Sequence, residues 1–419
     1  MKIRHPYIIL ALLTLAYTLS FMDRYAMNLL LNDVKRDLHL TEMQAGLLAG
    51  AGFAVLYALM TVPMGLLADR KNRITLATIG LTIWSVMTIF CGLAKNFGLL
   101  IIGRTGVGFG EAALTPAAYP VIKSLFKPKQ LATALGIYSC GIYLGSGLAY
   151  WLGGKVMAIS QAGLRANYFS FVDFDWQVVF IVFGLPGLLL AVLLLFVRIE
   201  KDEVADKKSY SFTELKQFLF LNNYRFLKFA LASSLFNVAV YAVGVWLPAY
   251  LQRAHNLTTA QSGELLGIVM LVVAPLGAIA GGTLGDKFGN ATGTNRLKAI
   301  MYSILLAAIC FALVCINLTG AVKYLPFVAL CFALSMPVAI TAATVQEMAP
   351  ANMRSIAPAI LLMFQNLIGM SLGPVLVAVL TQYVFCNDAS VGKSIGLVGV
   401  VFCMLSVLVF NTCKTSSHE

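Results

Sequence analysis

Residues 40–50 read LTEMQAGLLAG, and residues 257–267, which lie 217 positions later, read LTTAQSGELLG. The match continues without a gap through a long apolar segment in each copy. Both copies end in an acid followed by a cation, Asp69–Arg70 and Asp286–Lys287. Self-similarity at a fixed offset indicates a duplicated architecture. We therefore expect two related halves of about 200 residues, each built around the same apolar hairpin.

The composition indicates a membrane protein. The 419-residue chain is 59% hydrophobic and 11% charged, whereas soluble domains have about 25% charged residues. A helix needs roughly 20 mostly apolar residues to cross a bilayer. The sequence predicts an all-α polytopic membrane protein with twelve transmembrane helices in two pseudo-symmetric six-helix bundles. The twelve apolar stretches lie at about 7–31, 43–68, 74–94, 97–121, 131–158, 176–197, 224–252, 262–285, 297–318, 322–346, 355–385 and 391–413.

The charged residues predict the domains and the topology. We expect an N-terminal six-helix bundle at 1–197, a charged cytoplasmic linker at 198–223 and a C-terminal six-helix bundle at 224–419. The net charge is +12, and most Lys and Arg fall in loops that are cytoplasmic if the N-terminus is inside. This distribution follows the positive-inside rule and places both termini in the cytoplasm. The basic excess therefore reflects topology, and no nucleic-acid partner is expected.

The polar residues do not favour an enzyme. The eight cysteines form no paired C-x-x-C motif, so neither a metal site nor a disulfide is expected. The four histidines fall in predicted tails or loops, which leaves a lipid hydrolase or acyltransferase without a base inside the membrane. No Walker-type phosphate loop is present, and no cofactor is expected beyond a coupling proton. The duplicated architecture instead favours a proton-coupled secondary transporter that works by alternating access. A non-transporting sensor with the same fold is the further alternative.

Four ionisable residues lie inside predicted helices: Asp23 and Arg24 in the first span, and Arg104 and Glu111 in the fourth. Such residues cost roughly 2.5–3.5 kcal/mol each on insertion scales, and they usually serve a function. Arg104 and Glu111 are two helical turns apart and share a face. We expect Asp23 and Glu111 to carry the coupling proton. Arg104 would compete for the carboxylate or bind an anionic substrate, and Arg24 could do the same. The alternative is an ion-pair network that only fixes helix register.

The repeated acid–base element predicts a conformational latch. It closes the second and eighth spans on the cytoplasmic side, where an acid at a helix end can pair with a neighbouring helix in only one state of a transport cycle. For a single copy, a stop-transfer charge cluster is an equal alternative, but two copies at matching positions favour the latch. Its expected members are Gly65, Asp69, Arg70, Arg73, Gly282, Asp286 and Lys287.

Other polar residues in apolar surroundings are candidates for a substrate cavity, although each also fits a role in helix–helix contact. The candidates are Tyr17, Asn28, Tyr138, Tyr143, Asn237, Tyr241, Gln365 and Asn366. The opposite part of the cavity would be apolar, with Phe236, Met363, Phe364 and Met370. A charged end and an apolar end together favour an amphipathic substrate.

The two Gly-x-x-x-Asp-basic loops resemble the signature of the major facilitator superfamily, with Asn72 where Gly is usual in the first copy. Within it, Asp23–Arg24 and residues 104–112, 144–148 and 176–187 resemble bacterial Spinster-like transporters, with Gln177 where Arg is common.

This resemblance implies a functional monomer and, in some members, proton-linked movement of lysolipids or sphingoid phosphates. It also implies that Asp23 and Glu111 are the protonating acids, with Arg104 beside Glu111. Short tails and compact loops suit a bacterial inner membrane. The alternatives are an organic anion:proton symporter for a carboxylate, sugar acid or siderophore, and a drug-type exporter.

Overall fold

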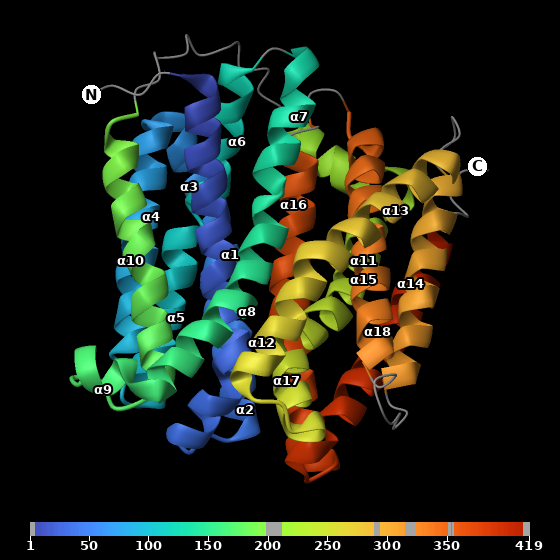
Figure 1. The fold of residues 1–419 in the computed structure, drawn as a ribbon. Coiled ribbons are helices and arrows are strands. Elements are labelled where there is room, and N and C mark those ends of the chain that lie inside the picture. Colours follow the sequence, from blue (N-terminus) through green and yellow to red (C-terminus); the bar gives the residue numbers. More distant parts are fainter. Residues whose placement is uncertain are drawn as a thin grey trace. The chain divides into compact units, whose positions relative to one another are not determined.

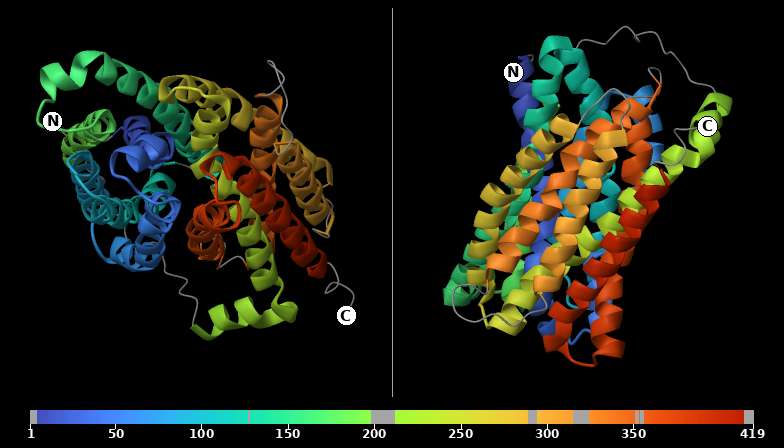
Figure 2. Two further views of the ribbon diagram at one scale, coloured as in Figure 1. Left: turned by 90° about the horizontal axis from the view of Figure 1, so that it is seen from below. Right: turned by 90° about the vertical axis from the view of Figure 1, so that its right-hand side faces the viewer.

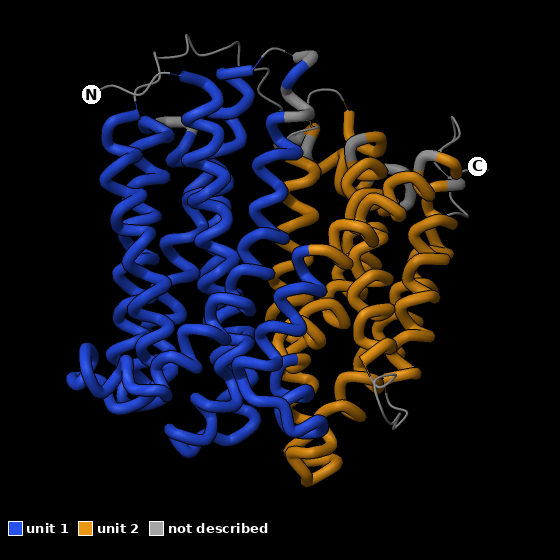
Figure 3. Tube along the Cα trace, viewed as in Figure 1, with its two compact units in different colours: residues 1–205, 248–271 blue, residues 206–247, 272–419 orange. Residues whose placement is uncertain are grey.

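The computed structural model describes residues 5–126, 128–197, 212–288, 294–314, 324–350, 353 and 356–413. These residues are almost all helical (Figure 1), which confirms the predicted all-α fold class. Contacts between Cα atoms divide the chain into two compact units (Figure 3). Unit 1 comprises residues 1–205 and 248–271, and unit 2 comprises residues 206–247 and 272–419.

Unit 1 is a set of apolar helices packed lengthwise, in which α4 packs on α5 and α10, and α1 packs on α8 (Figure 2). Its helices are α1 (Pro6–Asp37), α2 (Glu42–Ala49), α3 (Ala51–Arg70), α4 (Arg73–Gly92), α5 (Phe97–Glu111), α6 (Leu114–Leu125), α7 (Pro128–Ser139), α8 (Gly141–Ile159), the π-helix η1 (Ser160–Leu164), α9 (Arg165–Tyr168), α10 (Asp175–Leu195) and α12 (Thr259–Ile268).

Unit 2 is also helical. In it, α15 packs on both α13 and α14, and α18 packs on α14. Its elements are α13 (Ala274–Phe288), α14 (Thr294–Val314), α15 (Leu325–Met348), α16 (Ile356–Phe364), the π-helix η4 (Gln365–Met370), α17 (Ser371–Val379), the π-helix η5 (Leu380–Val384), the 3-10 helix η6 (Asp388–Ser390) and α18 (Val391–Thr412). Two elements belong to both units: α11 (Phe212–His255) enters unit 1 at Pro248, and the π-helix η2 (Val269–Val273) leaves it after Leu271.

Eleven helical segments of the described chain are long and apolar enough to cross a membrane. They correspond to every predicted span except the fifth, at 131–158. There the helix is divided at Cys140 into α7 and α8, of 12 and 19 residues. The polytopic character is thus confirmed, while the count of twelve spans and the cytoplasmic termini stay predictions.

The predicted duplication is visible in the local structure of both copies. Thr41 caps α2, accepting a hydrogen bond from the Gln44 amide at 3.2 Å, and the Gln44 side chain accepts one from the Thr41 amide at 2.9 Å. Thr258 and Gln261 form the same capping box at the start of α12, with distances of 3.2 and 3.0 Å. The residue two positions before each cap has a positive φ, 52° at His39 and 54° at Asn256. The two copies therefore share the turn before the helix and the capping box that begins it, which is a sequence signature of a helix N-terminus.

The unit boundaries fall inside the predicted C-terminal half. The end of α11 and all of α12 cluster with unit 1 because α12 packs along α8. The predicted division at 1–197 and 224–419 stays a prediction, and residues 198–211 of the predicted linker lie outside the described residues.

Gln177, the position where the resemblance expected Arg, has a structural role at the start of α10. Its side-chain oxygen accepts hydrogen bonds from the backbone amides of Asp173 and Phe174, both at 2.8 Å, and its amide donates to the Ala94 carbonyl at 3.0 Å. The fully buried side chain thereby ties α10 to the segment after α4.

Candidate functional site

The four ionisable residues predicted inside the membrane are all buried in unit 1, with exposed fractions of 8% or less. Asp23 and Arg24 lie near the middle of α1, Arg104 lies in α5, and Glu111 is the last residue of that helix. Helices α1 and α5 therefore approach each other as the charges require, and two acids offset two bases within protein.

Glycines bring α5 close to its neighbours at this level. A Cβ atom at Gly110 would lie 2.7 Å from the Trp84 backbone nitrogen of α4, and one at Gly108 would lie 2.5 Å from the Phe53 carbonyl of α3. Any larger residue at these two positions would push the helices apart. The sequence thus places Glu111 one residue after a close helix–helix contact, which holds its backbone in place.

The Glu111 carboxylate receives three hydrogen bonds on one oxygen. Arg24 donates from Nε at 2.7 Å and from Nη2 at 2.6 Å, and the Ser20 hydroxyl donates at 2.6 Å, all to Oε2. Among the described residues, Oε1 is buried and has no hydrogen-bond partner. The group is therefore strongly bound through one oxygen while its other oxygen is unused.

Asp23 and Arg104 form a second, weaker pair of contacts. The Asp23 Oδ2 accepts a hydrogen bond from the Thr88 hydroxyl at 2.9 Å, and Oδ1 has no partner within the described chain. Arg104 donates to backbone carbonyls, those of Leu48 and Asp23, at 3.5 and 3.4 Å. The described hydrogen bonds of Arg104 are thus long and go to neutral acceptors, which hold its charge less firmly than a carboxylate would.

The resemblance placed Arg104 beside Glu111, but the arginine that binds Glu111 is Arg24. Arg104 and Glu111 share a face of the fourth span, but they are two turns apart, and their side chains contact different neighbours. The approach of α1 decides the pairing, and spacing within one helix does not contain that information. Ser20 and Thr88 were missed, although Ser20 precedes Arg24 by one helical turn and so shares its face.

Aromatic rings surround the Arg24 guanidinium. Its Cζ atom lies 4.8 Å from the ring centres of both Phe21 and Phe53 and 4.5 Å from that of Tyr57. Cations within about 6 Å of a ring face are attracted by its quadrupole. Arg24 therefore keeps favourable partners even when its carboxylate contact is broken.

Two predicted cavity residues extend this aromatic group in unit 1. Tyr17 stacks on Tyr138 at 4.4 Å and meets the edge of Phe21 at 5.1 Å. Asn28 is buried in α1, which also contains Tyr17, and Tyr143 is partly buried on α8.

The other four cavity candidates lie in unit 2. The Tyr241 hydroxyl of α11 donates to the Asn366 side chain at 3.0 Å, and the Asn237 amide donates to the Ser233 carbonyl at 2.9 Å. Gln365 and Asn366 begin the π-helix η4, a distortion that is frequent at functional sites.

Part of the predicted latch lies outside the described residues. The side chains of Asp69, Arg70 and Asp286 are not described. Gly65 and Gly282 lie within α3 and α13, Lys287 is in the last turn of α13, and Arg73 begins α4. The helix ends stand where the sequence placed them, while the latch itself stays a prediction.

The sequence also contains one hydrolase-like motif that was not among the predicted features. Residues 369–373 read GMSLG, the G-x-S-x-G pattern of hydrolases. Here the segment is helical, and both of its glycines pack against α11: Cβ atoms there would lie 2.7 Å from Asn237 Cβ and 2.5 Å from the Val238 carbonyl. The glycines serve helix packing and do not form a strand-to-helix nucleophile turn.

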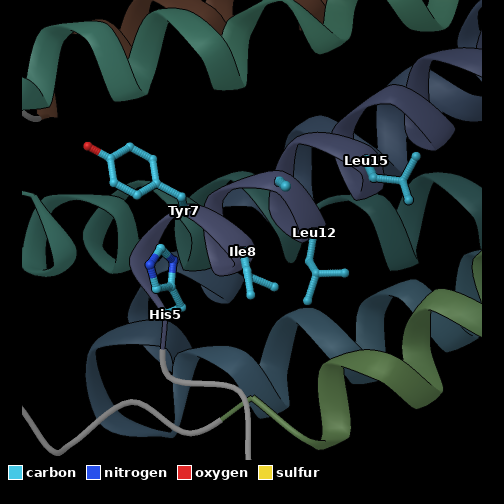
Figure 4. A pocket seen from close by; sticks show the side chains of 6 residues that line it. His5, Tyr7, Ile8, Leu12 and Leu15 are labelled. Carbon is cyan, nitrogen blue, oxygen red and sulfur yellow. The ribbon is translucent and has the colours of Figure 1, made fainter.

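A separate apolar groove of about 410 Å³ lies beside the start of α1 (Figure 4). It is lined by His5, Tyr7, Ile8, Ala11, Leu12 and Leu15, and none of the buried charges borders it. Among the described residues, no three His, Cys, Asp or Glu side chains are grouped to hold a metal ion.

Comparison with known proteins points to one family. The Major Facilitator Superfamily matches residues 13–374. Three curated relatives are similar over much of the chain. An MFS-type efflux pump of Mycolicibacterium smegmatis is 26% identical over 90% of this chain and 85% of its own length. A probable L-galactonate transporter of Escherichia coli is 26% identical over 71% and 66%. The sphingosine-1-phosphate transporter SPNS2 of Xenopus tropicalis is 29% identical over 58% and 45%.

A solved structure matches almost end to end. It is the crystal structure of a bacterial homolog to the human lysosomal transporter Spinster, in an inward-facing and unoccupied conformation. The TM-score is 0.83 at 25% sequence identity, and the match covers 98% of this chain and 97% of the other. The predicted similarity to Spinster-like proteins is thereby confirmed.

Proposed function

The chain belongs to the major facilitator superfamily, and on that premise we propose that it is a proton-coupled secondary active transporter that works by alternating access. Its cargo in this proposal is a small organic solute with an anionic group, of lysolipid-like or organic-acid type. The observation that carries the proposal is the Glu111 carboxylate, which is buried, bound by Arg24 through one oxygen and, among the described residues, unpartnered at the other.

A carboxylate in this position can exchange a cation for a proton. Breaking a buried ion pair leaves an uncompensated charge, which costs about 3–5 kcal/mol. A proton on Glu111 removes that cost because the neutral acid needs no cationic partner. Arg24 and a proton are thus alternative partners of the same group, and Oε1, which has no partner among the described residues, is the atom that can take the proton.

The same exchange gives a route for substrate coupling. An anionic group of the solute that binds Arg24 competes with Glu111 for the guanidinium, whose planar fork suits carboxylates and phosphates. Glu111, once released, takes up a proton. Substrate and proton then bind together, which favours symport. Asp23, which accepts a hydrogen bond from Thr88 on one oxygen only within the described chain, is the second proton acceptor in this proposal.

The surroundings of Arg24 suit a solute with an apolar or ring-shaped part. Phe21, Phe53 and Tyr57 offer aromatic faces next to the cation. A lipid-like tail and a sugar ring both pack on such faces. The named relatives include a sphingosine-1-phosphate transporter, a probable L-galactonate transporter and an efflux pump, so both solute classes and a drug-type substrate belong in the test.

The proposal includes four further parts. The acids Asp69 and Asp286 act as the cytoplasmic latch with Arg70, Arg73 and Lys287. The transporter works as a monomer, in a bacterial inner membrane. No cofactor takes part besides the coupling proton.

The test is proton movement in proteoliposomes that contain a pH-sensitive dye. Lysophospholipids, sphingosine phosphates, sugar acids, other small carboxylates, siderophores and cationic drugs are added one at a time. We expect one class to move protons in the wild type and Glu111→Gln to abolish that signal with the fold retained. Glu264→Gln, the same substitution at an exposed position of α12, is the matched control and should behave as wild type.

The outcome decides the coupling role. Solute accumulation driven by a pH gradient in Glu111→Gln would refute the assignment of Glu111. A solute that moves in the wild type without any proton flux would refute proton coupling and leave facilitated transport.

A further inference from the structure

A second group of buried polar residues lies at the end of unit 1 where α2 and α12 begin, away from the N-terminus (Figure 1). Both helices follow an odd-numbered predicted span. With the N-terminus in the cytoplasm, this end of unit 1 faces the outside. No predicted site residue lies in this group.

Glu42, the first residue of α2, binds the last turn of α11. Its Oε1 accepts a hydrogen bond from Arg253 Nη1 at 2.7 Å, and both side chains are buried, with exposed fractions of 2% and 7%. Arg253 also donates from Nε to the Asn32 side chain of α1 at 2.8 Å, and Lys35 forms an ion pair with Glu42. One carboxylate thus joins the end of α1 to the end of α11.

Thr259, the first residue of α12, binds α1 in return. Its hydroxyl donates to Asp33 Oδ2 at 2.6 Å, and both residues are buried. Gln252 adds a hydrogen bond from its amide to the Leu29 carbonyl at 3.1 Å. These contacts again connect the first half of the sequence with the second.

The two contacts are related by the duplication. Glu42 and Thr259 are 217 positions apart, and each directly follows the N-cap threonine of an equivalent capping box. Each reaches from the first turn of a helix in one half to the last turns of a helix in the other half. The two contacts are therefore reciprocal, and we call each of them an arm. One arm is the Glu42–Arg253 ion pair, and the other is the hydrogen bond from the neutral Thr259 hydroxyl to Asp33.

A glycine seam brings α12 against α8 beside this group. A Cβ atom at Gly263 would lie 2.3 Å from the Tyr150 carbonyl, and one at Gly154 would lie 3.0 Å from the Ala260 carbonyl. Ser262, one turn after Thr259, is fully buried there, and its hydroxyl has no hydrogen-bond partner among the described residues. The seam is close enough to exclude water while the two arms are formed.

We infer that Glu42, Arg253, Asn32, Asp33 and Thr259 form an outer clasp, which closes the outer side of the transporter in one state and separates in every cycle. The inference rests on the proposed alternating-access function, and it assigns the outer closure to this reciprocal pair of contacts. The members connect helices from both halves of the sequence, so they cannot all stay in contact when the outer ends of the halves move apart.

The chemistry of the clasp suits repeated opening. An apolar seal would expose hydrophobic surface when it opens, at about 25 cal/mol per Å². The charged and polar groups of the clasp are instead hydrated when they separate, and this hydration offsets the loss of their mutual hydrogen bonds. Buried ion pairs contribute little net stability for the same reason. A polar clasp therefore lowers the free-energy cost of opening relative to an apolar seal.

The test uses a buried reporter in the seam. Ser262→Cys introduces a thiol that an impermeant thiol reagent, added from outside, reaches only when the clasp is open. Modification of residue 262 is followed by peptide mass spectrometry, which separates it from the native cysteines. Glu42→Gln in this background removes the charge of one arm and keeps its shape.

We expect Glu42→Gln to raise the modification rate roughly ten- to hundredfold, the effect on a two-state equilibrium of losing one hydrogen bond to a charged group. Lys95→Gln is the control, since Lys95 lies at the same end of unit 1, is 63% exposed and pairs with Asp173, which is not part of the clasp. It should change the rate less than twofold.

An unchanged rate in Glu42→Gln would overturn the inference, and so would an equal increase in Lys95→Gln. Thr259→Val tests the other arm if Glu42→Gln does not fold, and an unchanged rate there would also overturn it. The assay needs neither substrate nor a proton gradient. Faster labelling without any proton-coupled flux would therefore contradict the proposed coupling and leave the clasp in place.

Discussion

Replacement of Arg24 by glutamine tests whether the Arg24–Glu111 pair is a coupled unit. The substitution removes both hydrogen bonds from the guanidinium to Oε2, at 2.7 and 2.6 Å. Ser20 then remains as the one donor to Glu111 among the described residues. The carboxylate side chain is fully buried, so water cannot replace Arg24 without entering the packed helices.

The expected cost follows from these interactions. Breaking a buried ion pair costs about 3–5 kcal/mol, and removal of the cation from the faces of Phe21, Phe53 and Tyr57 adds roughly 1–2 kcal/mol in total. The double variant Arg24→Gln, Glu111→Gln also lacks these cation–ring interactions but contains no buried charge at this pair. We therefore expect Arg24→Gln alone to be less stable than the double variant by about 2–3 kcal/mol, most of the cost of an unpaired buried charge.

The assay is unfolding by SDS titration in mixed micelles, with the wild type, both single variants and the double variant compared as a double-mutant cycle. Arg165→Gln is the control for the chemistry of the change, because Arg165 at the start of α9 pairs with Asp175 at the start of α10 and both side chains are partly exposed. Its cost should stay below about 1 kcal/mol. If the double variant is as unstable as Arg24→Gln, the two residues are not coupled and the exchange of Arg24 for a proton loses its basis.

Two further predictions concern the duplicated elements. Thr41→Ala and Thr258→Ala each remove one capping box, and each should lower the free energy of unfolding by about 1 kcal/mol in the same micelle assay, equally in both copies. Gly263→Ala should prevent the close approach of α12 to the Tyr150 carbonyl and raise outside labelling of a thiol at residue 262, whereas Gly244→Ala, where an added Cβ meets nothing within 4 Å, should leave labelling unchanged. Unequal effects of the two threonines, or equal effects of the two glycines, would contradict these expectations.

The sequence predicted the fold class because the bilayer imposes simple rules. Long apolar segments and the 217-residue offset are local patterns, and the structure confirms the all-helical architecture and the equivalent helix starts at Thr41 and Thr258. The fifth predicted span, which is made of α7 and α8 on either side of Cys140, is not among the eleven segments.

The candidate site was predicted at the level of residues but not of partners. The cost of intramembrane charge singled out Asp23, Arg24, Arg104 and Glu111, and all four are buried in unit 1. Their pairing depends on the rotation of α1 about its axis and on glycine contacts that set the level of α5. Spacing along one helix defines a face but not what the face meets, so both arginines were candidates for the carboxylate, and in the structure Arg24 binds it.

The outer clasp was missed for a different reason. Glu42 and Asp33 fall at the ends of predicted spans, where charged residues are common and hydration is the ordinary assumption. A signal was nevertheless present, since the offset that aligns the two copies also aligns Glu42 with Thr259 and Arg36 with Arg253. Polar residues that recur at the first turn of repeated helices would have suggested a reciprocal contact.

Duplication and divergence together fit the proposal of one coupling site and a closure with two equivalent contacts. At the offset of 217, the counterparts of Asp23 and Arg24 are Val240 and Tyr241, so the second copy has no equivalent charge pair in α11. In the proposed cycle, the single Glu111–Arg24 pair exchanges one carboxylate, one cation and a proton. The proposed closure differs, because its contacts come from equivalent positions of both copies. The copies therefore retain equivalent helix starts for closure, and they differ where a second coupling site would blur the stoichiometry of transport.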